Sequence, residues 1–240
     1  MLKSRLCIAF FAFAVGCAPA QKPLTDYVNP MLGTATLWDS VDLGFKPTKR
    51  TWGAEVFPGS SLPNAMVQVS PVTKFRSGAG YQYEDSVIYG FTHTNKGHWN
   101  LCHIPLLPVT GTPTPGDYCS PFSHERESAA PGYYQVFLDR YGVDAQLSST
   151  LRCAFHKYTY PVGAAPAVLA DLQRSNEHVR AWDIRKEGDN VFSGWQQTGE
   201  KMYFYAVANR PVTGIEPVVE GDREVRIVRF GEGDGALELR

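Results

Sequence analysis

Residues 151–160 read LRCAFHKYTY, and neighbouring positions differ in polarity. If this chain is extended, one side carries Leu151, Cys153 and Phe155. The other side carries Arg152, His156 and Tyr158. A period of two is typical of a β-strand whose two faces meet different surroundings. The stretch therefore predicts a half-buried strand rather than a helix.

Segments of the same kind recur along the chain between Gly, Pro, Asn and Asp residues that favour turns. They are residues 65–70, 86–91, 104–109, 133–139, 143–148, 167–171, 178–184, 190–196, 202–209 and 224–230. No segment carries a convincing helical stripe. Many short strands separated by turns predict an all-β fold, an antiparallel β-sandwich rather than a parallel α/β sheet. The last residues, GEGDGALELR, enter a new strand, and no later strand follows to pair with it. We therefore expect unpaired backbone groups there and a natural chain that continues.

The bulk composition is that of an ordinary globular protein. The chain has 240 residues, of which 43% are hydrophobic, enough for the core of one large domain. Its 23 basic and 24 acidic residues give a net charge of −1. Because no positive field gathers phosphates, nucleic acid is not expected as a partner.

The first twenty residues have the layout of an export signal. Lys3 and Arg5 precede an apolar run, Leu6–Val15, which is too short to cross a bilayer core of about 30 Å. We therefore assign residues 1–20 to a leader and 21–240 to the mature domain. The run ending in Cys17 resembles a bacterial lipobox, while Ala18-Pro19-Ala20 resembles an ordinary cleavage site. We favour lipidation of Cys17, hence an exported protein in the periplasm or at the cell surface, lipid-anchored to a bacterial membrane.

Three cysteines remain outside the leader: Cys102, Cys119 and Cys153. In an oxidising compartment one disulfide can form among them, and buried free thiols are the alternative. Their spacing does not choose between the two.

The stretch YGFTHTNKGHWNLCHIPLLPV, residues 89–109, concentrates polar and aromatic groups between two predicted strands. His93, His98 and His103 are five residues apart, which places them on different faces of a helix or a strand. Zinc-site spacings are absent, so a zinc enzyme is the weakest alternative. We interpret the stretch as a loop that offers His93, His98, Trp99 and Asn100 to a sugar, whose C–H face stacks on an indole and whose hydroxyls need polar partners. The alternative is a core Trp99 with histidines that cap turns.

Glu125 and Glu127 form the other candidate site. Two glutamates at i and i+2 on a strand share a face, and glycoside cleavage uses two carboxylates about 5–10 Å apart. A charged run before a Pro-Gly turn is more often a solvated connection, which is the interpretation we favour.

Six motifs, taken in order, resemble the N-terminal domain of glycoside hydrolase family 92. They are YVNPMLGT (27–34), FPGSSLPNAMVQVSP (57–71), GYQYEDSVIYGFTHT (80–94), PLLPVTG (105–111), FSHERESAAPGYYQVFL (122–138) and LRCAFHKYTYP (151–161). The resemblance runs from Tyr27 to the end of the chain. After FTHT, however, many relatives have a short Gly-rich turn where this chain has NKGHWNLCH, so linkage preference does not carry over.

The resemblance implies a calcium-dependent, exported exo-α-mannosidase that inverts the anomeric centre and trims N-glycans or mannan. It implies a β-sandwich docked on a C-terminal (α/α) barrel that this chain lacks. The general acid, the general base and most Ca²⁺ ligands would belong to that barrel. We therefore expect no catalytic residue in this chain, no activity from it alone, and a mannose-pocket wall made by His93, His98, Trp99 and Asn100. The expected partners are α-mannoside glycans and the chain's own C-terminal domain. The alternative function is a free-standing carbohydrate-binding β-sandwich without catalysis.

Overall fold

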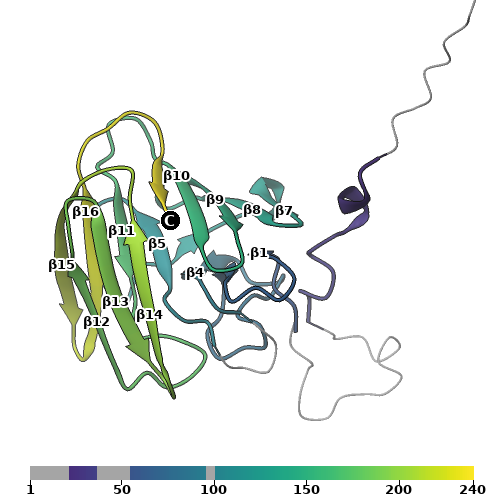
Figure 1. Ribbon diagram of the computed structural model, residues 1–240, viewed down its shortest axis with the longest axis horizontal. Helices are drawn as coiled ribbons and strands as arrows, with labels where there is room; N and C mark the ends of the chain where they lie inside the picture. The colour runs from purple at the N-terminus through teal and green to yellow at the C-terminus, as the bar shows by residue number, and fades with distance from the viewer. Residues whose placement is uncertain (1–21, 37–54, 96–100) are drawn as a thin grey trace, which may run out of the picture.

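The computed structural model describes residues 22–36, 55–95 and 101–240. The leader predicted for residues 1–20, with Cys17, lies outside them. Two 3₁₀ turns, η1 (Leu24–Tyr27) and η2 (His124–Arg126), accompany strands that pair antiparallel throughout the described ranges. Figure 1 shows these strands as facing sheets, which confirms the predicted all-β antiparallel sandwich. No helix in these ranges has the length and apolar character needed to cross a membrane.

One layer of the sandwich is a seven-stranded sheet. Its order is β1 (Ser60–Ser61), β2 (Gln68–Val72), β4 (Gly90–Thr92), β5 (Leu106–Val109), β11 (Ala167–Ala170), β16 (Arg223–Phe230) and β15 (Val212–Glu220). In β5 and β11 every residue is buried. Because these strands are covered on both faces, their sequences LLPV and AVLA are apolar without alternation.

The other layer consists of two sheets joined by the last strand. One has the order β17 (Leu237–Leu239), β10 (Ala154–Thr159), β9 (Val143–Ser149), β8 (Tyr133–Leu138) and β7 (Glu127–Ala130). The second has the order β12 (Ala181–Lys186), β13 (Val191–Gln197) and β14 (Lys201–Val207). A small separate sheet pairs β3 (Val87–Ile88) with β6 (Ser120–Pro121).

The expectation that the final strand has unpaired backbone groups is wrong for β17. This strand pairs with β10 on one side, and Leu239 forms a bridge with Ala208 on the other. Both partners precede β17 in the sequence, so a search for a later partner could not find them.

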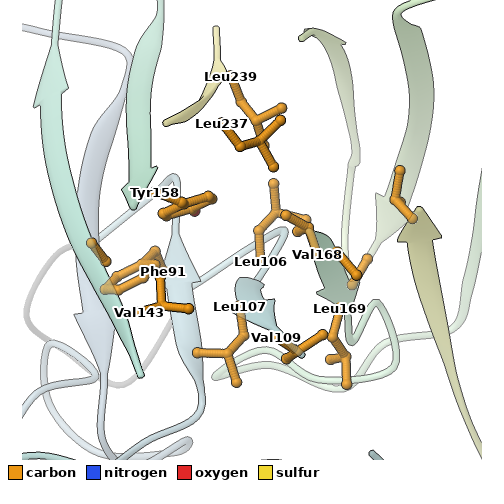
Figure 2. Packing of buried hydrophobic residues seen from close by; sticks show 14 of the residues in the cluster. Phe91, Leu106, Leu107, Val109, Val143, Tyr158, Val168, Leu169, Leu237 and Leu239 are labelled. Atoms are coloured by element: carbon orange, nitrogen blue, oxygen red, sulfur yellow. The ribbon is translucent and has the colours of Figure 1, made fainter. Parts of the chain in front are cut away.

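The core lies between the two layers, where Figure 2 shows side chains from β4, β5 and β11 meeting those from β9, β10 and β17. On β10 the predicted alternation is present, and the buried side is the one with His156 and Tyr158. Phe155 points outward and is 38% exposed, whereas Leu151 and Cys153 precede the strand. The more polar side of this strand is therefore the side that packs.

Candidate functional site

The predicted sugar-binding loop joins β4 to β5. The structure describes its two ends, residues 93–95 and 101–105, which we call the loop base. His98, Trp99 and Asn100 lie outside the described residues, so their assignment to the sugar pocket stays a prediction. Of the four proposed contacts, His93 alone can be placed.

The loop base adopts an unusual backbone. Leu101 (φ 65°), Cys102 (φ 56°) and Ile104 (φ 56°) all lie in the left-handed region. Residues other than glycine rarely adopt this region, and a β-branched residue such as isoleucine does so least readily. Each such residue costs on the order of 1–3 kcal/mol and persists only where its surroundings determine it. Clustered strain of this kind is more frequent at functional sites than elsewhere.

Backbone hydrogen bonds hold this conformation from both sides. The two ends bond to each other and to the segment after β11: Cys102 N–H to Thr94 O at 2.7 Å, His93 N–H to His103 O at 3.0 Å, and Asn176 N–H to Leu101 O at 3.0 Å. The ends of the loop are therefore fixed relative to the sandwich.

Two buried side chains complete the support. The amide nitrogen of Asn95 donates to the carbonyls of Gln68 (2.8 Å) and Thr92 (3.2 Å), and its oxygen accepts from the hydroxyl of Thr92 at 2.9 Å. The Cys102 thiol packs beside Asn95, and burial raises its pKa to about 12. A Cβ on Gly80, whose φ is +89°, would lie 2.6 Å from the Cys102 sulfur, so glycine is needed there. The sequence motifs did not single out Asn95.

His93 connects the loop base to the core. Its Nδ1 lies 2.8 Å from the carbonyl oxygen of Ile104, and its Nε2 lies 3.0 Å from Nε2 of His156. Nδ1 of His156 in turn lies 2.7 Å from the hydroxyl of Tyr158. Burial lowers the pKa of His93 to about 4 and holds that of His156 well below its ordinary value. Both imidazoles are therefore neutral at neutral pH.

His103 has a separate set of partners. Its ring nitrogens lie 2.8 Å from the Thr94 hydroxyl and 3.0 Å from the Thr198 hydroxyl, and Glu177 is 3.8 Å away. Burial lowers the pKa of His103, while the Glu177 carboxylate opposes that shift. No group of three or more His, Cys, Asp or Glu residues able to hold a metal exists within the described ranges. His93 and His103 thus serve different hydrogen-bond networks, which gives the zinc alternative no support.

A hollow of about 670 Å³ is connected to the loop base through Glu177, although no residue of the loop base itself lines it. Glu177, which lines it, accepts a hydrogen bond from the backbone N–H of Leu101 at 3.3 Å. The guanidinium of Arg174 lies over the rings of Phe75 and Tyr89 on the same wall. Aromatic faces beside charged hydrogen-bonding groups suit a polyhydroxylated ligand. No local sequence signal marks Arg174 and Glu177 as part of this wall, because they follow a strand about seventy residues after the loop.

The glutamates that the sequence offered as a carboxylate pair have different surroundings. The side chain of Glu127 is 1% exposed and accepts from the hydroxyls of Tyr81 (2.9 Å) and Tyr134 (2.6 Å) and from Nδ1 of His124 (2.5 Å). Glu125 is exposed on η2, whereas Glu127 begins β7, so the two do not share a strand face. The favoured interpretation, a solvated connection, is therefore wrong for the buried Glu127 and agrees with the exposed Glu125, and the shared strand face on which the pair hypothesis depended is absent.

The three cysteines outside the leader are free thiols. Cys102 is buried, Cys119 is half-buried and Cys153 is exposed. Of the two alternatives that the spacing left open, the structure shows free thiols, although only one of them is fully buried.

Three solved structures with the same fold are each much longer than this chain. The α-mannosidase BT3965 of Bacteroides thetaiotaomicron, in complex with mannoimidazole, matches with a TM-score of 0.77 and 24% identity over 91% of this chain and 32% of its own. The inverting mannosidase BT2199 of the same organism gives 0.72 and 23% over 92% and 32%. The glycosyl hydrolase ccman5 gives 0.65 and 25% over 80% and 30%. This chain thus spans about a third of each of these structures.

No curated protein sequence matches the chain. The model of the glycosyl hydrolase family 92 N-terminal domain, however, matches residues 27–234. This match covers most of the chain and agrees with the fold of the structures above and with the resemblance seen in the six motifs. The chain therefore belongs to glycoside hydrolase family 92, as its N-terminal domain.

Proposed function

We propose that this chain is the β-sandwich part of an exported, inverting α-mannosidase that removes terminal α-linked mannose from N-glycans or mannan. The observation that carries the proposal is the loop base on a family 92 sandwich. It is strained, bonded on both sides, and hydrogen-bonded to Glu177 in the wall of a hollow of about 670 Å³. Loops held on a rigid scaffold are where binding residues concentrate. The two mannosidases with this fold, BT3965 and BT2199, support the choice of reaction.

In this proposal the sandwich contributes one wall of a mannose pocket. Trp99 stacks on the apolar face of the sugar, and His93, His98 and Asn100 orient the ring and its hydroxyls. Both ring nitrogens of His93 already have partners, and His93 lines a separate cavity of about 300 Å³ rather than the 670 Å³ hollow. Its proposed contact with the sugar is therefore limited to the outer surface of its ring. The general acid, and the general base that activates water on the opposite face of the sugar, come from a C-terminal domain.

The described residues do not fit a calcium site of their own, since no acidic cluster of ligating size lies among them. Calcium coordination, which the family resemblance implies, is accordingly assigned to the C-terminal domain. No role in calcium binding is proposed for this chain.

Export places the enzyme where glycans are found. The proposal includes cleavage of the leader just before Cys17, lipidation of Cys17 as the new first residue, and a location in the periplasm or at the cell surface. Its support is the order of charged, apolar and small residues at the start of the sequence.

Replacing Trp99 tests the proposed pocket. In a protein that carries the C-terminal domain, Trp99→Ala should lower kcat/KM by about 1–3 kcal/mol of transition-state binding, because the stacking surface is lost. Trp195→Ala is the matched control. Trp195 lies on β13 beneath the ammonium of Lys201, on the face of the strand opposite Gln196, which bonds to the loop base, and its loss should leave kcat/KM unchanged. An unchanged kcat/KM for Trp99→Ala would remove Trp99 from the pocket.

The alternative function is a carbohydrate-binding sandwich that works without catalysis. Calorimetric titration of this chain alone with mannobiose separates the two. Tight binding favours the alternative, whereas a half-pocket should bind weakly, because most of the sugar would stay in water.

A further inference from the structure

The layer that contains β17 has a break in it. β10 and β14 flank β17, and in Figure 1 the C-terminal mark lies between these two strands. Along β14, Val207 bonds to Arg240, but the residues from Lys201 to Ala206 pair with β13 alone. On the other side of the break, Ala154 extends past the pairing with β17. Two strand edges therefore face each other with no strand between them in the described part of the chain.

The direction of the backbone groups follows from the ladder. Val207 N–H bonds to Arg240 O, and Arg240 N–H bonds to Val207 O. Because alternate residues of a strand point their N–H and C=O groups to the same side, those of Tyr203 and Tyr205 also point into the break. Among the described residues, neither tyrosine has a backbone partner on that side.

The same reasoning gives the opposite edge. Arg240 points its backbone groups toward β14, so Leu239 points its own toward His156 on β10. Two residues further along β10, the N–H and C=O of Ala154 face the break. Where β17 separates them, β10 and β14 lie two strand spacings apart, about 9.5 Å. Where it begins, at the end of β17, the break is thus the width of one strand.

Behind the break lies a cavity of about 300 Å³ with an apolar lining that includes Ile104, Leu106, Met202 and Phe204. Met202 and Phe204 alternate with the exposed tyrosines of β14 and yet remain only half-buried. In β17, Leu237 and Leu239 point inward and are 0% and 2% exposed. A strand in line with β17 would continue this alternation and cover the half-buried side chains.

We propose that the break is a docking slot for one extended segment, the polypeptide that follows Arg240 in a longer chain. The segment bonds to Ala154 on one side and to Tyr203 and Tyr205 on the other, and its first and third residues are apolar and fill the cavity. This proposal rests on the proposed function, which needs a second domain, and on relatives about three times as long as this chain. The slot is also lined by His93, so the connection to that domain runs beside the loop base.

Two extensions of this chain test the slot. One adds eight residues after Arg240 with valine at the first and third positions and threonine at the second and fourth. The matched control exchanges valine and threonine, which shifts the pattern by one residue and points the apolar side chains outward. We expect the first extension to slow hydrogen exchange of the Tyr203 and Tyr205 amides by at least about ten-fold and to raise the Tm, and the control to do neither. Equal exchange at both amides in the extended and unextended chains would overturn the proposal.

A pair of variants at one position checks that the backbone makes the contact. Tyr205→Pro and Tyr205→Thr both remove the ring, but only proline removes the N–H that faces the slot. In the chain with the first extension, Tyr205→Thr should keep the slow exchange at Tyr203 and Tyr205→Pro should lose it. Equal protection in the two variants would contradict the assignment. These measurements involve no sugar. A negative result would therefore refute the docking slot alone, whereas an unchanged kcat/KM in Trp99→Ala would count against the proposed sugar pocket.

Discussion

His93 and His156 form a hydrogen-bond chain with one direction. The carbonyl of Ile104 can only accept, so Nδ1 of His93 carries a proton and its Nε2 accepts from His156. Nδ1 of His156 then accepts from the hydroxyl of Tyr158. The tautomers of both rings are thereby fixed. This row of hydrogen bonds links Ile104, one of the left-handed residues of the loop base, to the core.

This arrangement makes stability depend on pH. The pKa of His93 is lowered to about 4, below the ordinary 6.5, so the unfolded chain binds a proton that the folded chain does not. The contribution of neutral His93 to the free energy of unfolding is fully present above pH 6.5. As the pH falls toward 4, the free energy of unfolding decreases by up to about 3 kcal/mol. His156, whose pKa is also lowered, acts in the same direction.

We therefore expect His93→Asn to flatten the pH dependence. The variant is less stable at pH 7, and between pH 6.5 and 4 its slope of unfolding free energy against pH is smaller by up to about 1.4 kcal/mol per pH unit. Urea titrations of both proteins at several pH values measure this difference. The contribution of titrating carboxylates is the same in both proteins and therefore cancels. Parallel curves would show that His93 does not titrate as its surroundings imply.

The two neighbouring glutamates offer a second prediction. Glu127→Gln should lower the free energy of unfolding by about 2–4 kcal/mol, because a buried carboxylate that satisfies three donors is replaced by an amide that brings donors of its own. The matched change Glu125→Gln, on an exposed 3₁₀ turn, should stay within about 0.5 kcal/mol. Chemical unfolding of each variant provides the comparison, and equal losses would be inconsistent with the buried role of Glu127.

At the scale of elements, β13 packs closely through a residue without a side chain. A Cβ on Gly194 would lie 2.2 Å from the carbonyl oxygen of Asp183 and 2.8 Å from the ring of Phe204. Gly194→Ala should therefore push β12 or β14 away and cost about 1–3 kcal/mol. Gly199 has no atom within 4 Å of its Cβ position, so Gly199→Ala is the control, with a change under about 0.5 kcal/mol. Thermal unfolding tests both, and a neutral Gly194→Ala would mean that the strands adjust without loss.

The strands most visible in the sequence are those with one buried face. The expected segments 133–139 and 143–148 correspond to β8 and β9, which alternate between buried and half-buried residues as half-covered strands do. β15 is not among the segments expected from the sequence. It contains Gly214 and Pro217, residue types that interrupt most strands, yet an edge strand tolerates both. The local sequence pattern does not show which side of β10 is buried. His156 can be buried only because His93 and Tyr158, which contact it in the folded structure, provide hydrogen-bond partners.

For the whole molecule, the motifs identified the family and the fold but only part of the candidate site. His93 was found because it lies in a dense polar stretch. Arg174 and Glu177 were not, because pairing of β11 with β5 brings distant residues to the loop base, and sequence spacing carries no trace of such pairing. Strain at Ile104 was equally hidden, since it follows from contacts rather than from residue type.

The proposed inverting mechanism leads to a prediction for a protein that carries both this sandwich and a C-terminal domain. Hydrolysis of an α-mannoside by a protein with both domains should release β-mannose first, since water attacks opposite the leaving group. This chain alone should release none, because in the proposed function it supplies only one wall of the pocket. Proton NMR during the first turnovers distinguishes the anomers, and α-mannose as the first product would exclude inversion.

The seven-stranded sheet ends in β15, where Pro217 lacks an N–H and Glu216 and Glu220 add charge. Such a border is a poor template for a foreign strand. The exposed backbone of Tyr203 and Tyr205 has no comparable protection. If concentrated preparations of this chain form fibrils, growth should start at β14, and adding lysine there would be the first remedy for storage.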